Sequence, residues 1–337
     1  MKATGNIDGM LLTQLALCVI AKAGFGQEVQ WGSEATPEGY RLTFKEALFT
    51  VSSNLIMILM MPNWAWGLRK SWRDVRLASD ELKTYLRKMI ETRREVKEQD
   101  ADEVVGQKHD LFNQLIHARD ASDKLSEDEL IGNIWLFLVA GHETTAHTMA
   151  IALGLLALYP SVQKKLVEQI KQVESEHENP VVVYETLRMF PMALATARRA
   201  TTDTALTIGH GSNTRTIQVP ASTHAYMLPT SLHYNPSYWD EPEDFNPDRF
   251  MDSHWNRDAF VAFSLGPRAC IGRRFAETTL VAGLSVLFSK YDVSIDESRF
   301  KPIPGESMAE RRTRLIRPSA GLTLTPATIP LIFTPRK

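Results

Sequence analysis

A single long helix, from about 127 to 159, is predicted near the middle of this chain, and its length governs how the other segments can pack. Ser126 and Glu129 form a capping-box pattern at its start, and Leu125 and Leu130 occupy the hydrophobic-staple positions. At 1.5 Å per residue the helix is roughly 50 Å long, which is enough to cross an entire domain. Because it is apolar on most faces towards both ends, it must be buried.

Polar side chains nevertheless gather at the middle of this helix, where His142, Glu143, Thr144 and Thr145 follow one another and His147 comes soon after. Burying such groups without partners costs several kcal/mol, so the cluster calls for a functional explanation. A zinc-protease helix with the pattern H-E-x-x-H is one alternative, but the two histidines are five residues apart. That spacing is about 140° around a helix and prevents chelation of one ion. A purely structural polar patch stays open.

The segment FSLGPRACIG, residues 263–272, places Cys270 in a glycine-bounded turn that opens an apolar helix. The N–H groups and dipole at the start of that helix favour the deprotonated sulfur. Gly266 and Gly272 leave the backbone bare on both sides, so a large flat ligand can approach the sulfur closely. Positive charge on the same turn comes from Arg268, Arg273 and Arg274.

Two other roles for Cys270 remain open from the residues alone. It can be an inert, small apolar side chain, or the nucleophile of a cysteine hydrolase, although no spacing argues for a histidine base. The second cysteine, Cys18, lies in an apolar helical pattern and is predicted to belong to the core. With two cysteines in the chain, a disulfide framework is implausible.

The segment 263–272 resembles the cysteine-ligand loop of the cytochrome P450 family, the haem-thiolate monooxygenases, whose signature is F-x-x-G-x-R-x-C-x-G. The resemblance implies that Cys270 ligates the haem iron. It also implies that the cofactor lies against the other matching positions, which are Phe263, Gly266, Arg268 and Gly272. Arg198, with Arg199 in a less suitable register, resembles the residue that pairs with a haem propionate, and Arg268 would be the second contributor.

The polar cluster of the long helix resembles the family's oxygen-activation motif, [AG]-G-x-[DE]-T-[TS], at residues 140–145. The resemblance implies that Gly141 lets a haem face press against the helix. It further implies that Glu143 and Thr144 are the catalytic residues that deliver protons.

Residues 184–191 contain the pair Glu185 and Arg188, which alone would be an ordinary surface ion pair on a helix. Here the pair resembles the family's E-x-x-R motif, and a P-x-R-F segment downstream supplies Arg249. The resemblance implies a buried Glu185–Arg188–Arg249 network that fixes the cysteine loop, which is a structural role.

The remaining segments predict a small β region and several further helices. A hairpin over 205–208 and 214–219 and a strand near 223–228 form the β region, about 205–228. The C-terminal strands, 322–325 and 329–333, are expected to form another hairpin.

In the first third of the chain we expect a buried helix over 43–61 and an interfacial contact at 60–68, where two tryptophans lie. A long amphipathic surface helix is expected over 69–99.

The composition, with 44% apolar and 23% charged residues, is that of an ordinary globular protein. The formal net charge of −2, without a basic block, argues against a nucleic-acid partner. The N-terminal residues contain no signal peptide or membrane anchor.

The expected fold is therefore mainly α, a cytochrome P450 fold with a small β region, in which residues 1–337 form a single partial domain whose N-terminal part is missing. The link from Glu174 to Tyr184 is short for the family, and the run from Pro180 to Val183 is a weak helix start. These departures predict that the chain binds haem weakly or not at all. An inactive truncated or mis-spliced fragment is accordingly an alternative.

The resemblance implies a monooxygenase, similar to fungal microsomal members, that inserts one atom of O2 into a lipophilic small molecule such as a terpenoid secondary metabolite. Electrons would come from NADPH through NADPH–cytochrome P450 reductase, docked near the basic turn. The full-length protein would lie on the cytoplasmic face of the endoplasmic reticulum membrane, and a chain without an anchor would be cytoplasmic. A haem-thiolate isomerase or dehydratase is the other alternative, although it has no need of Glu143 and Thr144.

Overall fold

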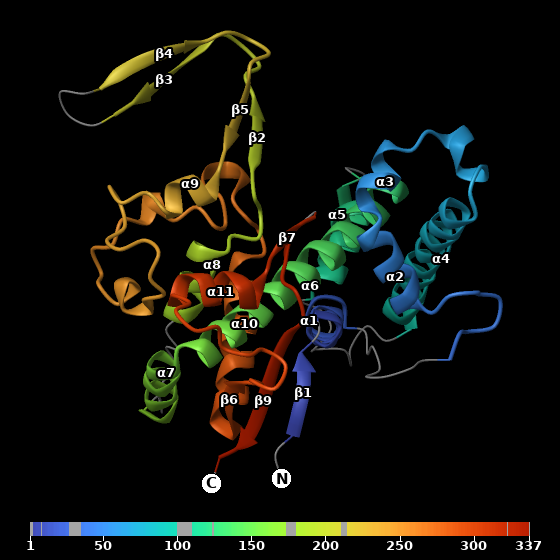
Figure 1. The fold of residues 1–337 in the computed structure, drawn as a ribbon. Helices are drawn as coiled ribbons and strands as arrows, with labels where there is room; N and C mark the ends of the chain where they lie inside the picture. Colours follow the sequence, from blue (N-terminus) through green and yellow to red (C-terminus); the bar gives the residue numbers. More distant parts are fainter. Residues whose placement is uncertain are drawn as a thin grey trace. The chain divides into compact units, whose positions relative to one another are not determined.

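The computed structural model of the chain describes residues 3–7, 9–26, 35–99, 110–122, 125–172, 180–209, 214–321 and 323–336. They are mainly helical, with short antiparallel strands, as the sequence predicts (Figure 1). Contacts divide the chain into two compact units, one of residues 1–6 with 148–337 and the other of residues 7–147. Most of the link from Glu174 onwards and the turn after Gly209 lie outside the described residues.

The smaller unit is helical. Its elements are α1 (Gly9–Phe25), α2 (Phe44–Ser53), α3 (Leu55–Met60), η1 (Asn63–Gly67), α4 (Lys70–Gln99), α5 (Leu111–Ser122) and the first part of α6 (Glu127–Leu158). Helix α4 packs on α2 and η1, and α1 packs on α5. The buried face of α4 is the predicted apolar stripe, which includes Val75, Ala78, Leu82 and Leu86.

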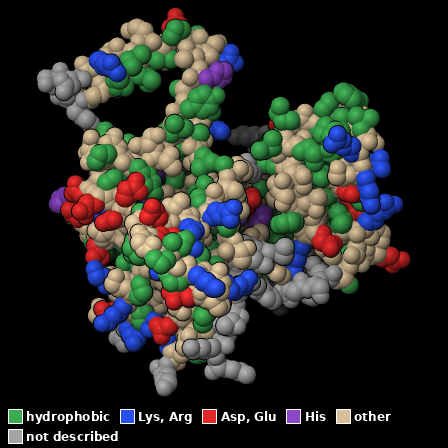
Figure 2. Space-filling view, in the orientation of Figure 1, with side chains coloured by type: hydrophobic (Ala, Val, Ile, Leu, Met, Phe, Trp, Pro, Cys, Tyr) green, Lys and Arg blue, Asp and Glu red, His purple; other side chains and the backbone are tan. Residues whose placement is uncertain are grey.

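The segment expected to be one buried helix over 43–61 is two helices, and that expectation is wrong for its second half. Helix α2 starts with a capping box between Thr43 and Glu46 and buries one face. The helix is interrupted at Asn54, whose side chain donates a hydrogen bond to the Thr50 carbonyl. Helix α3 follows with no buried residue, and its Ile56, Leu59 and Met60 are exposed. Figure 2 shows hydrophobic side chains at the surface over this helix.

Helix α6 extends over Glu127–Leu158, very near the predicted range. The capping box is present, because the Ser126 backbone N–H and hydroxyl both donate to Glu129 Oε2 and the Glu129 N–H donates to Ser126 Oγ. The helix ends before Pro160, since a proline disfavours helical geometry in the residue that precedes it.

Within the described part of the chain, no single helix is both long and apolar enough to cross a membrane. Helices α6 and α7 (Pro160–Gln172) reach that length and composition only as a pair, bent by 111°. The apolar residues of α6 belong largely to the protein core, among them Leu138, Ile151 and Leu155.

The larger unit carries helices α7, α8 (Val181–Met189), α9 (Pro229–His233), α10 (Arg273–Lys290) and α11 (Met308–Ile316) and the short 3-10 turns η3 (Pro247–Phe250), η4 (Arg257–Ala259) and η5 (Gly266–Arg268). Helix α10 packs on α7 and α8, and α8 packs on α9 and η3.

The prediction of a weak helix start after Pro180 is wrong. Helix α8 begins directly at Val181, and burial of the three valines outweighs their low helix propensity.

Four small sheets are present in the described part of this unit. Their strands are β1 (Ala3–Ile7), β2 (Thr196–Arg199), β3 (Thr204–Ile208), β4 (Arg215–Val219), β5 (His224–Met227), β6 (Tyr291–Ile295), β7 (Ser319–Ala320), β8 (Leu324–Thr325) and β9 (Ile329–Pro335). The predicted hairpin is present as β3–β4, and it lies at the outer end of the β2–β5 ladder (Figure 1). The predicted C-terminal hairpin is wrong, because β8 pairs with β7 whereas β9 lies between β1 and β6.

Candidate functional site

The cysteine loop holds its thiol in an open position. Cys270 is exposed and lies two residues before Gly272, the N-cap of α10. The Cys270 N–H donates to the Phe263 carbonyl at 2.8 Å, which ties the two ends of the loop together. Gly266 has a φ of +73°, a backbone conformation that residues other than glycine rarely adopt. The sequence therefore folds here into a closed turn that presents one sulfur.

The surroundings of the thiol fit a large flat cofactor. A Cβ atom added at Gly266 or Gly272 would meet nothing within 4 Å, and the apolar Ile271 is 85% exposed beside the sulfur. Among the described residues there is no group of three or more His, Cys, Asp or Glu side chains that could hold a metal ion. A lone thiolate can still hold haem iron, because the porphyrin nitrogens supply most of the donors that the iron needs.

A polar cluster that sequence reasoning missed joins the start of α10, directly after the cysteine loop, to α8. The Arg273 side chain donates to Glu277 Oε1 at 2.7 Å and to the Tyr184 hydroxyl at 3.3 Å, and that hydroxyl donates to Glu277 at 2.8 Å. The Arg273 guanidinium also lies over the Phe263 ring, 5.2 Å from its centroid. Arg273 is thus engaged with α8, whereas Arg268 and Arg274 are exposed.

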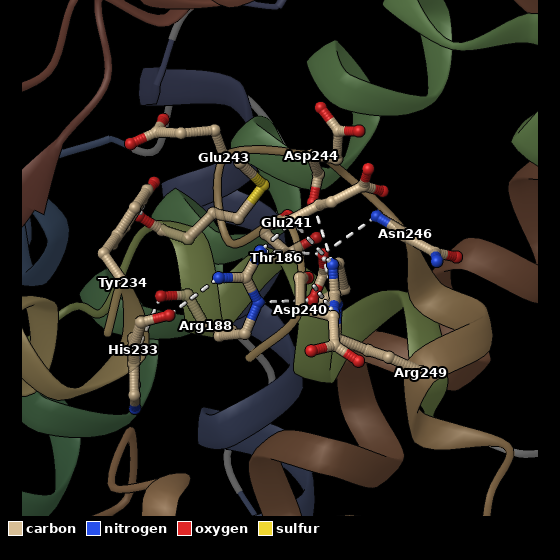
Figure 3. A network of polar contacts seen from close by, with 12 residues as sticks. Thr186, Arg188, His233, Tyr234, Asp240, Glu241, Glu243, Asp244, Asn246 and Arg249 are labelled. Atoms are coloured by element: carbon tan, nitrogen blue, oxygen red, sulfur yellow. Dashed lines mark hydrogen bonds and ion pairs between the residues drawn. The ribbon is translucent and has the colours of Figure 1, made fainter. Parts of the chain in front are cut away.

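The structure brings together the three residues of the E-x-x-R and P-x-R-F motifs, and Figure 3 shows the two arginines, Arg188 and Arg249, within this network. Glu185 and Arg188 are fully buried, with 0% exposure. Arg188 binds both Glu185 oxygens, through Nε at 2.7 Å and Nη2 at 2.9 Å. The Arg249 Nε and the Asn246 N–H both donate to Glu185 Oε1, at 3.2 and 2.8 Å. The carboxylate therefore has a partner on each oxygen.

The two arginines also bind backbone carbonyls at the end of α9 and in the segment between α9 and η3. Arg188 donates to the carbonyls of His233 and Asp244, at 2.8 and 3.2 Å. Arg249 donates to the carbonyl of Asp240 at 2.9 Å. Charge-assisted bonds of this kind are stronger than bonds between neutral groups, so the network fixes the path of this segment.

His233 is a second residue that the sequence did not reveal. It ends α9, is fully buried, and contacts the backbone on two sides through its ring nitrogens. Burial lowers the pKa of His233 to about 4, and the Arg188 charge adds to this, although a hydrogen bond to the Arg188 backbone opposes it. No motif contains this histidine, so no local pattern in the sequence could have indicated it.

Arg198 and Arg199 lie on the exposed strand β2, opposite Ala225 and His224 of β5. Consecutive strand residues point to opposite faces of a sheet, so only one of the two can face a given ligand. Arg199 donates to the Ser222 hydroxyl at 2.9 Å, whereas Arg198 donates to the carbonyl of its neighbour Ala197 at 3.0 Å. This leaves Arg198 as the better candidate for a carboxylate ligand.

On α6 the hydroxyl and imidazole groups of the polar cluster bond to the helix itself. Thr144 and Thr145 donate to the carbonyls of Ala140 and Gly141, each at 2.8 Å. His142 Nδ1 lies 2.6 Å from the Leu138 carbonyl oxygen. Glu143 differs, because its Oε2 is buried with no hydrogen-bond partner and burial raises the pKa of its carboxyl group.

A Cβ atom added at Gly141 would clash with the end of the Ile20 side chain, so the missing side chain gives α1 room beside α6. The haem contact that the resemblance implies for Gly141 stays a prediction. Burial lowers the pKa of His147 to about 4 and also lowers that of His142, which keeps both rings neutral. Neither histidine belongs to a group of three or more possible metal ligands within the described residues.

The comparisons with known proteins agree on one family. The model of the cytochrome P450 family matches residues 6–319. Cytochrome P450 monooxygenase 124 of Postia placenta is 38% identical over 97% of this chain, and cytochrome P450 monooxygenase ORF6 of Penicillium roqueforti is 26% identical over 85%. The chain spans only 65% and 58% of the lengths of these two relatives.

Solved structures show the same fold. The crystal structure of a cytochrome P450 (CYP102L1) matches with a TM-score of 0.75 at 23% identity, covering 99% of this chain and 73% of that one. The haem domain of cytochrome P450DA matches with a TM-score of 0.72 at 22% identity, covering 99% and 70%. With a family match over most of its length and a cysteine loop and E-x-x-R network in the order of that family, the chain belongs to the cytochrome P450 family.

Proposed function

We propose that this chain forms the catalytic part of a haem-thiolate monooxygenase. It would insert one oxygen atom of O2 into a lipophilic small molecule, such as a terpenoid secondary metabolite, while the other atom leaves as water. The observation that carries the proposal is the exposed Cys270 thiol, presented at the start of α10 by a closed and glycine-containing loop.

The residues that would hold the haem lie on the cysteine loop and on β2. Cys270 would ligate the iron, with Phe263, Gly266 and Gly272 forming the surface under the ring. The guanidinium groups of Arg268 and Arg198 would bind the two propionates. When bound, the haem supplies the activation of dioxygen, and its thiolate ligand favours cleavage of the O–O bond.

Proton delivery would be the task of Glu143 and Thr144. Burial raises the pKa of Glu143, so its carboxyl group holds a proton at a higher pH than an exposed glutamate and can act as a donor. The Thr144 hydroxyl donates to the Ala140 carbonyl, so it must exchange that bond before it can donate elsewhere. The two side chains then form a short relay on one turn of α6.

The test of this function uses 18O2, NADPH, a P450 reductase and a panel of terpenoids with the haem-loaded protein. We expect one labelled atom per product molecule, and with Thr144→Ala we expect about tenfold less product per NADPH consumed, with peroxide in its place. Thr145→Ala is the matched control, because the Thr145 hydroxyl also donates to the carbonyl four residues before it, that of Gly141.

An unchanged yield in Thr144→Ala would assign Thr144 a structural role only. Rearranged products without label, formed without consumption of NADPH, would favour the isomerase or dehydratase alternative over a monooxygenase.

We propose further that a reductase docks near the basic turn, where Arg274 is exposed, while Arg273 stabilises the loop through its bond to Glu277. Charged side chains at the rim of such a surface mainly steer the approach of a partner of opposite charge. NADPH would thus act through the reductase without a site of its own on this chain.

The exposed side chains of α3 and η1 support a peripheral contact with a membrane. Leu59, Met60 and Trp64 are 73%, 78% and 77% exposed, and Ile56 and Leu68 of the same stretch of chain are exposed as well. We name these five residues the α3–η1 patch, and Figure 2 shows hydrophobic side chains at the surface over α3. Three basic residues follow the patch in the sequence, namely Arg69, Lys70 and Arg73. Apolar groups beside cations suit the surface of a bilayer, here the cytoplasmic face of the endoplasmic reticulum.

Replacing Leu59 and Trp64 together by serine should weaken binding to phosphatidylcholine–phosphatidylserine vesicles by about 10²-fold. The estimate follows from the roughly 1.5–3 kcal/mol gained when one large apolar side chain leaves water. Flotation with the vesicles measures it, and Leu206→Ser on the exposed β3 strand is the control. Equal flotation of all three proteins would show that the α3–η1 patch does not bind lipid.

A further inference from the structure

His233 connects two segments that are distant in the sequence. Its Nδ1 lies 2.9 Å from the carbonyl oxygen of Arg188, 45 residues away, and its Nε2 lies 2.9 Å from the backbone nitrogen of Val261, 28 residues away. The connection to α8 is reciprocal, because the Arg188 side chain donates to the His233 carbonyl at 2.8 Å.

The partners of the ring define its protonation state. The Val261 N–H can only donate, so Nε2 must carry a lone pair, and the Arg188 carbonyl can only accept, so Nδ1 must carry the proton. Both demands are met by the neutral Nδ1–H tautomer. The lowered pKa of His233, about 4, agrees with a ring that stays neutral under physiological conditions.

Val261 lies two residues before the cysteine loop. Its carbonyl accepts a hydrogen bond from Ser264 at 2.9 Å, and the Phe263 carbonyl accepts one from Cys270. The preceding residue, Phe260, stacks on the His233 ring with the centroids 5.5 Å apart and the planes 13° from parallel. The imidazole thus holds the chain by one hydrogen bond and one stacked ring where it approaches the loop.

The E-x-x-R network does not by itself reach this point. Within the described residues, the hydrogen bonds of Glu185 and Arg249 connect to one another, to Arg188 and to the segment 240–246. The His233 ring is what extends the buried network from Arg188 to Val261.

We propose that His233 is a positioning residue for Cys270, acting through Val261 to fix the start of the cysteine loop relative to α8. This role of His233 depends on the proposed function in one respect, namely that Cys270 is the haem ligand. A residue of this kind does not touch the cofactor. Its loss should change where the sulfur lies while the thiol itself remains.

Three substitutions of His233 separate its two hydrogen bonds. His233→Phe keeps a ring that can stack on Phe260 and removes both bonds. His233→Gln can place its amide oxygen near the Nε2 position and keep an acceptor for Val261, whereas His233→Asn can keep only a donor for the Arg188 carbonyl. His254→Phe, at an exposed site, is the control.

The first measurement is hydrogen exchange of the Val261 amide in the full chain without added haem. We expect the Val261 amide to exchange at least about tenfold faster in the His233→Phe and His233→Asn variants. In the His233→Gln variant its exchange rate should stay within about threefold of the wild-type rate. The amide of Leu284 in α10 reports whether the unit remains folded. The proposal would be overturned if exchange accelerated equally at the Val261 and Leu284 amides. It would also be overturned if the Val261 amide exchanged at equal rates in the His233→Asn and His233→Gln variants.

The second measurement is the ferrous–carbon monoxide spectrum with excess haemin. The Phe and Asn variants should shift much of the Soret absorbance away from the position of a thiolate complex, and Gln should retain it. If the exchange pattern holds and no protein in the series, wild type included, gives a thiolate spectrum, the haem proposal fails and the role of His233 in the loop stands. A thiolate spectrum unchanged in all variants would contradict a positioning role.

Discussion

Replacing Cys270 by alanine is expected to abolish the red-shifted Soret band of the ferrous–carbon monoxide complex when the chain is loaded with excess haemin. Alanine has no donor atom, and the loop of residues 263–272 contains no other sulfur. The loss should be complete, because the position of the band depends on a thiolate bound to the iron. Absorbance spectroscopy of the reduced protein under carbon monoxide measures it.

Cys18→Ala is the matched control, since it removes the only other sulfhydryl group of the chain. Cys18 lies within α1 and is partly buried, and burial raises the pKa of its thiol, which disfavours the thiolate. The band should be unchanged in this variant. A thiolate spectrum that survives in Cys270→Ala, or disappears in Cys18→Ala, would show that the wrong cysteine has been assigned.

Arg188→Ala is expected to lower the free energy of unfolding by about 3–5 kcal/mol, the usual result of removing one partner from a buried ion pair. Glu185 would keep the Asn246 N–H and Arg249 on one oxygen, while its other oxygen would lose its partner in a site closed to water. The shift of the urea midpoint measures the loss.

Two comparisons make the Arg188 result specific. Arg76→Ala removes an arginine from the exposed Arg76–Asp80 pair on α4 and should cost no more than about 1 kcal/mol. Arg188→Lys keeps the charge but lacks the planar donors that bind both Glu185 oxygens, so it should rescue stability only in part. Similar midpoints for Arg188→Ala and Arg76→Ala would mean that the buried pair adds little to stability.

The features predicted correctly from the sequence are those whose cause is local. The start of α6 follows from Ser126 and Glu129, which lie within one turn, and its end follows from Pro160. The buried face of α4 follows from apolar residues at helical spacing. The motifs around Cys270 and Glu185 can also be recognised from the sequence alone, because each is a short pattern with fixed spacing.

The features that were missed or wrong depend on partners far along the chain. Val181 begins a helix because the fold buries it, and β9 pairs with β6, whose first residue lies 38 positions before Ile329. His233 bonds to backbone atoms, which any residue at those positions would provide. A pattern search cannot find such a residue, since neither its partners nor its spacing are distinctive.

The distances along the chain within the Glu185 network have a consequence for synthesis of the protein. Glu185 is 61 residues from Asn246 and 64 residues from Arg249. At about 5–20 residues per second, roughly 3–13 s separate the translation of this glutamate from that of its last partner. During that interval its carboxylate has only Arg188 and water, so α8 cannot yet enter the interior. Newly made chains should therefore keep this helix accessible until the segment through Arg249 has left the ribosome.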